Sequence, residues 1–203
     1  MDKLYINVEK CEIAGGAKNL TPMVQEMDRR LQELASETIT IKNTLLKFAS
    51  TSASEQYKKA TLSVYNLSET ITEKSYQLND MQGQIVTYQN NISRFEDNGQ
   101  IFSNPNPFTV VKTQINVDTS VFKFNLEEMI EVNKCISKYT DNTREILKVL
   151  QSNKSSIGFI WKDPQYKDFE MFIDEIVSET NKNIDILEDY SKYLGQKIQE
   201  LNN

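Results

Sequence analysis

The most distinctive chemistry of this sequence surrounds its single tryptophan, Trp161, in the stretch IGFIWKDPQYKDF at residues 157–169. Asp163 followed by Pro164 is typical of a helix start, because the carboxylate accepts hydrogen bonds from the free amide groups there and proline fits the first turn. The stretch therefore predicts a bend between two helices. A large indole can fill the wedge where two helices diverge, and Tyr166 would continue the inner face of the outgoing helix.

Two interpretations of these aromatic residues stay open. In the first, Trp161 serves only to pack the turn. In the second, Phe159, Ile160 and Trp161 project from the protein and form an exposed contact patch for a partner. The candidate site, as a turn motif or as a partner contact, consists of Trp161, Asp163, Pro164, Tyr166, Phe169 and Phe159.

Residue composition argues against catalysis. The 203 residues include no histidine, which is the commonest acid–base group and metal ligand in proteins. No glycine-rich phosphate loop is present, and no pair of carboxylates stands out from the mixed surface charges. Cys11 and Cys135 lack metal-ligand spacing and are expected to be reduced thiols. We therefore expect a protein that is not an enzyme and that holds no metal or cofactor.

Charge and hydropathy disfavour two kinds of partner. The net charge of −6 argues against nucleic acid, whose phosphates require a positive face. No apolar run approaches the roughly 18 residues of a membrane span, and the N-terminus lacks the basic and apolar regions of a signal peptide. The expected location is the cytoplasm, with export without a cleavable signal peptide as the alternative.

An internal repeat organises the chain. A shift of 109 residues places KxxINVE at residues 3–9 on KxxINVD at residues 112–118, without a gap. The same shift places Gln56-Tyr57-Lys58 on Gln165-Tyr166-Lys167. Two identical blocks in one frame are hard to obtain by chance, so we interpret the chain as a diverged tandem duplication.

The repeat predicts the domain boundaries. A first helical hairpin spans residues 1–94 and lacks the tryptophan motif, and a second spans residues 110–203. The linker at residues 95–109 holds two of the four prolines and an Asp-Asn-Gly turn. Its apolar residues Ile101, Phe102 and Phe108 indicate that it lies against a surface.

Apolar side chains recur at alternating steps of three and four residues, which is the period of amphipathic helices. The stripes run through residues 20–48, 57–95, 126–150 and 169–201. Polar residues at stripe positions, which usually set helix register or face the edge of a seam, are Thr38, Lys74, Asn133, Thr140, Asn183 and Lys197. We predict an all-α fold in which two long antiparallel hairpins pack as an intramolecular four-helix bundle.

Helix-start signals agree with these stripes. Thr21-Pro22 predicts the start of the first helix, and Ser54 predicts that of the second in the way that Asp163-Pro164 does for the fourth. The Ile-Asn-Val segments before the first and third helices look extended. They form either a short pair of strands or a strap across the bundle.

The tryptophan turn resembles a known family. A long helix, a turn with Trp-x-Gly or a variant, and a Tyr or Phe entering a second long helix characterise the WXG-type helical hairpins of bacterial type VII secretion systems. Residues 121–203 are similar to this family through Trp161-Lys162-Asp163, Tyr166 and Phe169, with Asp163 at the glycine position. Residues 16–95 are similar only through the repeat.

The resemblance implies a non-enzymatic protein–protein interaction module. Family members pair as hairpins into four-helix bundles, are exported folded, and act as substrates, carriers or chaperones of larger effectors. The expected partner is therefore an effector or a secretion component, and the chain itself is expected to be a monomer that mimics a WXG-type dimer. The alternatives are a structural coiled-coil assembly protein of a phage or appendage, and a membrane-active helical toxin.

Overall fold

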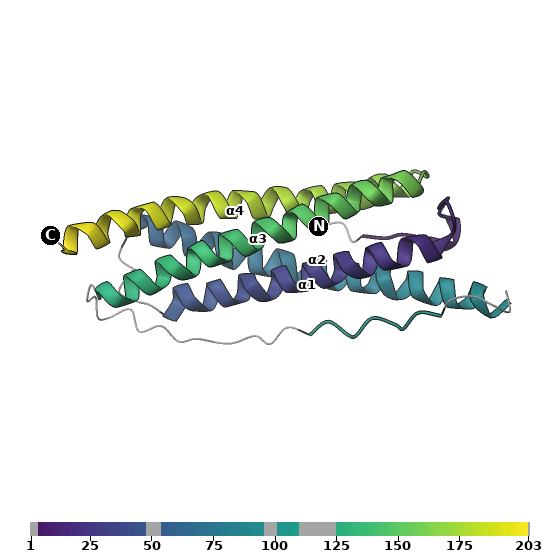
Figure 1. Ribbon diagram of the computed structural model, residues 1–203, viewed down its shortest axis with the longest axis horizontal. Coiled ribbons are helices and arrows are strands. Elements are labelled where there is room, and N and C mark those ends of the chain that lie inside the picture. Colours follow the sequence, from purple (N-terminus) through teal and green to yellow (C-terminus); the bar gives the residue numbers. More distant parts are fainter. Residues whose placement is uncertain (1–3, 48–53, 96–100, 110–124, 203) are drawn as a thin grey trace. The chain divides into compact units, whose positions relative to one another are not determined.

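The computed structural model describes residues 4–47, 54–95, 101–109 and 125–202. Its regular elements are η1 (Val8–Lys10), α1 (Ala17–Lys47), α2 (Glu55–Phe95), α3 (Leu126–Ile160) and α4 (Gln165–Asn202) (Figure 1). The predicted all-α fold is confirmed, because the four long helices form two antiparallel hairpins that pack as a four-helix bundle. None of the described helices carries a stretch long and apolar enough to cross a bilayer.

Packing divides the chain into two compact units, which are described separately. Unit 1 comprises Met1–Glu33, Thr72–Thr109 and Ile146–Val177. Unit 2 comprises Leu34–Ile71, Val110–Glu145 and Ser178–Asn203. Every long helix contributes one stretch to each unit, so each unit draws on both predicted repeats. The division into residues 1–94, 95–109 and 110–203 rests on the duplication and stays a prediction.

The apolar stripes predicted from the sequence are buried on all four helices. On α1 and α2 the buried stripe residues are Leu20, Val24, Met27, Leu31, Leu34, Ile41, Leu45, Tyr57, Ala60, Val64, Leu67, Ile71, Leu78, Met81 and Ile85. On α3 and α4 they are Met129, Ile136, Tyr139, Leu147, Leu150, Phe169, Ile173, Ile176, Leu187, Tyr190 and Leu194. Leu201, at the end of the last stripe, is exposed. Burial of these stripes supplies the main driving force for folding.

A polar layer in unit 2 joins all four helices. Thr38 of α1 lies 3.3 Å from the Tyr139 hydroxyl of α3, and that hydroxyl donates to Asn183 Oδ1 of α4 at 3.2 Å. Asn183 Nδ2 donates to Ser63 Oγ of α2 at 2.8 Å. Burial raises the pKa of the Tyr139 hydroxyl to about 12, so it keeps the proton that it donates. The layer explains why polar residues occupy two stripe positions, since a helix shifted along its axis would lose these bonds.

Lys74, the one break in the stripe of α2, is 5% exposed within unit 1. Its Nζ lies 2.6 Å from Glu175 Oε2 of α4 and 4.9 Å from the centroid of the Phe172 ring. The long aliphatic stem of a lysine can cover apolar surface while its ammonium reaches a partner. Lys74 is therefore accommodated in the core by an ion pair and a ring contact.

The structure confirms two of the three helix starts that the sequence predicts. The Tyr57 amide donates to Ser54 Oγ at 3.0 Å, and the Gln165 amide donates to Asp163 Oδ1 at 2.8 Å. The start predicted at Thr21-Pro22 is wrong, because α1 begins at Ala17. Thr21 Oγ1 donates instead to the Ala17 carbonyl inside the helix at 2.8 Å.

The described part of the linker, residues 101–109, lies against α2, so it lies against a surface as predicted, although Ile101 itself is exposed. The Phe102 amide donates to Asn90 Oδ1 at 2.9 Å, and Asn90 Nδ2 donates back to the Phe102 carbonyl at 2.7 Å. The Phe108 ring meets Tyr76 edge-on with 5.0 Å between ring centroids. Asn79 Nδ2 of α2 also donates to the Asn106 carbonyl at 3.2 Å, so two polar pairs and one aromatic pair hold the linker.

Asp28 is a carboxylate in the core of unit 1. Its Oδ2 accepts from Asn79 Nδ2 at 2.9 Å and from Gln32 Nε2 at 3.0 Å, while its Oδ1 is buried without a hydrogen-bond partner. Burial raises the pKa of Asp28, and the two amide donors offset only part of this effect. Ionisation of this carboxyl is therefore less favourable in the folded protein than in the unfolded chain.

Replacing Asp28 with asparagine is expected to raise the free energy of unfolding at pH 7. Because the pKa of Asp28 is higher in the folded than in the unfolded state, its contribution to stability is present below the unfolded pKa of about 3.9 and lost as pH rises. The advantage of Asp28→Asn should therefore shrink as pH falls from 7 to 3 in urea titrations. Asp80→Asn removes the same charge from an exposed position and should show no such gain; equal curves for the two variants would contradict the expectation.

Candidate functional site

Trp161 closes the turn between α3 and α4 in unit 1, with 0% of its surface exposed. Its ring lies 5.6 Å from that of Phe169 and 5.9 Å from that of Tyr166, measured between centroids. The two partners also contact each other, at 6.4 Å. Such tilted and edge-on pairs add to the stabilisation from burial alone. The three aromatic residues form one cluster, which fills the bend.

Asp163 connects this cluster to the backbone around it. Its Oδ2 accepts from Trp161 Nε1 at 2.6 Å and from the Glu12 amide at 2.6 Å. Its Oδ1 caps α4 through the Gln165 amide. One buried carboxylate thus orients the indole, starts a helix and holds a segment from the other end of the chain. Charge-assisted hydrogen bonds of this kind are stronger than those between neutral groups.

Residues 4–16, which we name the N-terminal strap, lie against this turn. Ile13 pairs with Trp161 in an isolated antiparallel bridge. The Ala14 amide donates to the Ile160 carbonyl at 2.7 Å, and the Lys162 amide donates to the Glu12 carbonyl at 3.1 Å. Residues 6–8, the first Ile-Asn-Val segment, belong to this strap and run into the 3-10 helix η1 at Val8, and the choice between a strap and a pair of strands stays a prediction. The second copy, residues 115–117, lies outside the described residues.

The remaining predicted site residues lie in different surroundings. Phe169 is buried, whereas Pro164 is exposed and Tyr166 is half-buried, its hydroxyl donating to the Lys154 carbonyl at 3.0 Å. Phe159 is 78% exposed, and the Lys162 ammonium lies 5.9 Å from its ring centroid. A contact patch that includes Trp161 is not formed, because the bend turns the indole inward and leaves Phe159 outside.

Sequence reasoning missed two parts of this site. Glu12 and Ala14 contact the turn through backbone groups, which leave no signal in side-chain type. Gly158 did carry a signal, since a glycine inside a helix costs about 1 kcal/mol and calls for a packing reason. A Cβ there would lie 2.6 Å from the Tyr166 hydroxyl oxygen. Gly158 therefore makes room for Tyr166 beside Trp161.

The thiols do not add reactive chemistry to the site. Cys11 lies in the strap, where burial and the nearby Asp163 carboxylate raise the pKa of its thiol to about 12. Burial, followed by Glu131, also raises the pKa of the Cys135 thiol. Both thiols are free and protonated at neutral pH, which keeps them poor nucleophiles. Within the described ranges no cluster of acidic residues and cysteines could hold a metal ion.

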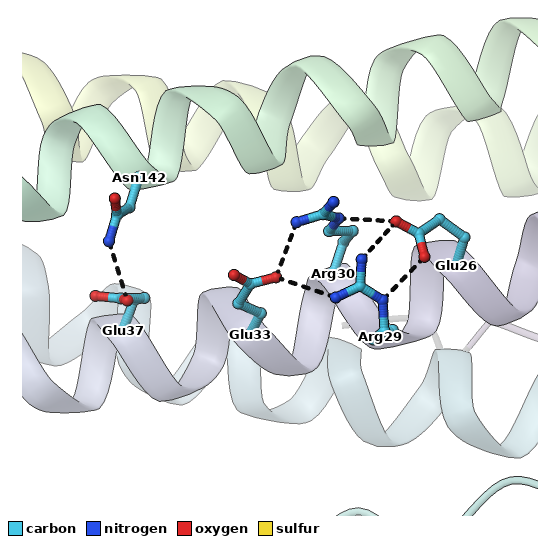
Figure 2. Close-up of polar contacts among 6 residues, drawn as sticks. All are labelled: Glu26, Arg29, Arg30, Glu33, Glu37 and Asn142. Atoms are coloured by element: carbon cyan, nitrogen blue, oxygen red, sulfur yellow. Dashed lines mark hydrogen bonds and ion pairs between the residues drawn. The ribbon is translucent and has the colours of Figure 1, made fainter.

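The densest charge cluster on α1 is a solvated face. Figure 2 shows Arg29 and Arg30 between Glu26 and Glu33, with separations between 2.7 and 3.7 Å. The hydrogen bond from Arg29 is the main cause that lowers the pKa of Glu26. Exposed pairs of this kind contribute little to stability, and their charges cancel locally.

The comparisons with known proteins give no relative: no protein-family model, no curated protein and no solved structure matches the chain. The groups at the tryptophan turn that could do chemistry are engaged with one another, since Asp163 binds three donors and the indole nitrogen binds Asp163. The arrangement stabilises the bend between α3 and α4 and fixes the strap against it.

Proposed function

We propose that the protein is a non-enzymatic protein–protein interaction module of a type VII-like secretion pathway, in which it acts as a substrate, a carrier or an effector chaperone. The observation that carries the proposal is the tryptophan turn. The rings of Trp161, Tyr166 and Phe169 pack together at the bend between α3 and α4. This is the arrangement that the resemblance to WXG-type hairpins leads us to expect.

The four-helix packing supports the same proposal. WXG-type hairpins pair into four-helix bundles, and here two hairpins of one chain satisfy each other's apolar stripes. In unit 2, residues of all four helices form one cluster: Ile41, Leu45, Tyr57, Ala60, Val64, Met129, Val132, Ile136, Tyr139, Leu187, Tyr190 and Leu194. Because the apolar stripes are buried inside the bundle, a partner protein would bind to its outer surface, as in a carrier that keeps its own fold.

The proposal is tested in the native host by comparing strains with and without the membrane-bound secretion ATPase. We expect either that the protein reaches the medium only when the ATPase is present, or that it stays in the cell in a stable complex with a secreted effector. Affinity purification after chemical crosslinking identifies that effector. Absence of both ATPase-dependent export and an effector complex would overturn the proposal.

Light scattering separates the proposal from the structural coiled-coil alternative. A chain whose hairpins satisfy each other should be a monomer of 23.5 kDa across a concentration series. Helical assembly proteins instead expose apolar seams that join further copies. Filaments or large oligomers that grow with concentration would favour the assembly protein, and an obligate dimer would contradict the pseudo-dimer.

A further inference from the structure

The two hairpins, α1–α2 (hairpin 1) and α3–α4 (hairpin 2), repeat a contact near the start of their second helices. The Tyr57 hydroxyl donates to the Leu45 carbonyl at 2.9 Å, and the Tyr166 hydroxyl donates to the Lys154 carbonyl at 3.0 Å. Both residues of the second contact lie 109 positions after those of the first. The shift found in the sequence therefore relates equivalent contacts, which supports the interpretation of the chain as a tandem duplication.

The compact units follow the same shift. Unit 1 combines the middle of hairpin 2, Ile146–Val177, with two stretches of the first copy, and unit 2 combines the middle of hairpin 1, Leu34–Ile71, with two stretches of the second copy. A shift of 109 residues carries 34–71 onto 143–180, within three residues of the corresponding stretch. A position in one unit therefore has an equivalent position, with equivalent neighbours, in the other.

The polar residues that break the apolar stripes of α2 and α4 are one such equivalent pair, since Asn183 lies 109 positions after Lys74. Their neighbours are equivalent as well. The Lys74 ammonium lies 4.9 Å from the ring centroid of Phe172, and Asn183 Nδ2 donates at 2.8 Å to Ser63, the residue 109 positions before Phe172. Both contacts join α2 to α4, so the two units share one arrangement of contacts between the hairpins.

The chemistry of the two arrangements differs. In unit 1 the buried Lys74 ammonium lies 2.6 Å from Oε2 of Glu175, which is partly exposed. In unit 2 Asn183 and Ser63 are neutral, and the residue equivalent to Glu175 is Asn66, which lines the same groove as Asn183. A buried ammonium needs a counter-charge, because its lost hydration is otherwise not compensated. Only unit 1 supplies that counter-charge.

This difference makes other pairings of the hairpins unfavourable. If hairpin 1 paired with hairpin 1 of a second chain, the equivalence would place Lys74 against Ser63 and Asn66, neither of which carries a charge. If hairpin 2 paired with a second hairpin 2, Glu175 would lie against Asn183 without a cation. The pairing of hairpin 1 with hairpin 2 is therefore the one that gives the buried ammonium a carboxylate.

We propose that Lys74 and Glu175 form a recognition pair that makes hairpin 2 the partner of hairpin 1 and disfavours a second copy of hairpin 1. The inference rests on the proposed pseudo-dimer of two hairpins and names the contact that enforces it. Hairpin 1 accepts a hairpin that carries a carboxylate at the position of Glu175 and an aromatic ring one turn earlier, at that of Phe172. Charged and polar residues at helix seams commonly determine partner choice in this way.

The test lets hairpins of different chains choose their partners. A protease site inserted after Asp97 of the linker allows the folded full-length protein to be cut once, with all its residues retained. Cut wild type is unfolded in urea together with the cut, heavy-isotope-labelled variant Lys74→Glu/Glu175→Lys, and the mixture is refolded. Native mass spectrometry then counts each complex. We expect matched complexes, which place a lysine opposite a glutamate, to exceed mismatched complexes at least tenfold.

Two controls make this result specific. Cut wild type mixed with its own heavy-labelled form should exchange hairpins at random. The reversal Lys59→Glu/Asp189→Lys changes the same charges at exposed positions of α2 and α4 that line one groove, and it should also exchange at random. Equal amounts of matched and mismatched complexes would overturn the recognition pair. So would complexes of two copies of hairpin 1 as abundant in the wild type as those of hairpin 1 with hairpin 2.

The uncut chain provides an independent measurement that decides the matter if the cut hairpins do not refold. Glu175→Lys places two ammonium groups together and should lower the urea midpoint of unfolding. Adding Lys74→Glu restores an ion pair and should recover at least half of that loss. No recovery would overturn the proposal. Because these measurements use only the purified protein, their failure removes the recognition pair without bearing on export or on an effector complex.

Discussion

Trp161→Ala is expected to lower the free energy of unfolding by about 3 to 5 kcal/mol, the range for deleting a large buried aromatic side chain. The indole is fully buried, contacts two other rings and donates to Asp163, so alanine leaves a cavity and removes one donor from that carboxylate. Urea unfolding followed by far-ultraviolet circular dichroism measures the loss. Hydrogen exchange should also show earlier opening of the N-terminal strap, because the same carboxylate holds Glu12.

Two matched variants show which property of the indole matters. Trp161→Phe keeps an aromatic ring in the cluster but loses the Nε1–H, and should cost about 1 to 2 kcal/mol. Phe159→Ala, two residues earlier and mostly exposed, should stay within about 0.5 kcal/mol of the wild type. If Trp161→Ala were no more destabilising than Phe159→Ala, the indole would not hold this turn, and the resemblance to WXG-type hairpins would lose its basis.

The second large effect is expected at Asn183, the centre of the polar layer in unit 2. Asn183→Ala should cost about 2 to 4 kcal/mol, because it leaves the buried Tyr139 hydroxyl and the Ser63 hydroxyl without the partners that they have now. Asn181→Ala, on an exposed position of the same helix, serves as the control and should be near neutral. Thermal unfolding of both variants gives the comparison.

A double-mutant cycle with Tyr139→Phe then measures the coupling. Once Asn183 is alanine, removing the Tyr139 hydroxyl deletes a group that has already lost one of its partners, so the double variant should lose less than the sum of the single variants. The coupling should amount to about 1 kcal/mol. Strict additivity would mean that the layer is a set of separate contacts and does not act as a network.

Local patterns predicted most of the fold. The three-and-four spacing of apolar residues located all four helices, because every stripe position must face the core for a long helix to be stable in a bundle. The same reasoning marked Lys74 and Asn183 as exceptions but could not supply their partners. The partner of Lys74 is Glu175 and that of Asn183 is Tyr139, and both partners lie on other helices. Which turn of one helix faces a given residue of another depends on tertiary packing, which a local pattern does not show.

The candidate site was predictable only in part. The capping role of Asp163 was predictable because a cap involves only neighbouring residues. The bond from the Glu12 amide to its second oxygen was not, because Glu12 is 151 positions away in the sequence. The start of α1 was misplaced for a related reason. Thr21-Pro22 carries a helix-start signal, but the positive-φ glycines before Ala17 let the chain turn earlier, and the Thr21 hydroxyl bonds inside the helix.

The pairing of Ile13 with Trp161 also bears on the order in which the chain assembles during its synthesis. Ribosomes add about 5 to 20 residues per second, so the first residues wait on the order of 10 to 30 seconds before the turn that binds them exists. The backbone bonds of Glu12 and Ala14 to the turn can therefore form only after residues 160–163 have been made, long after the strap itself.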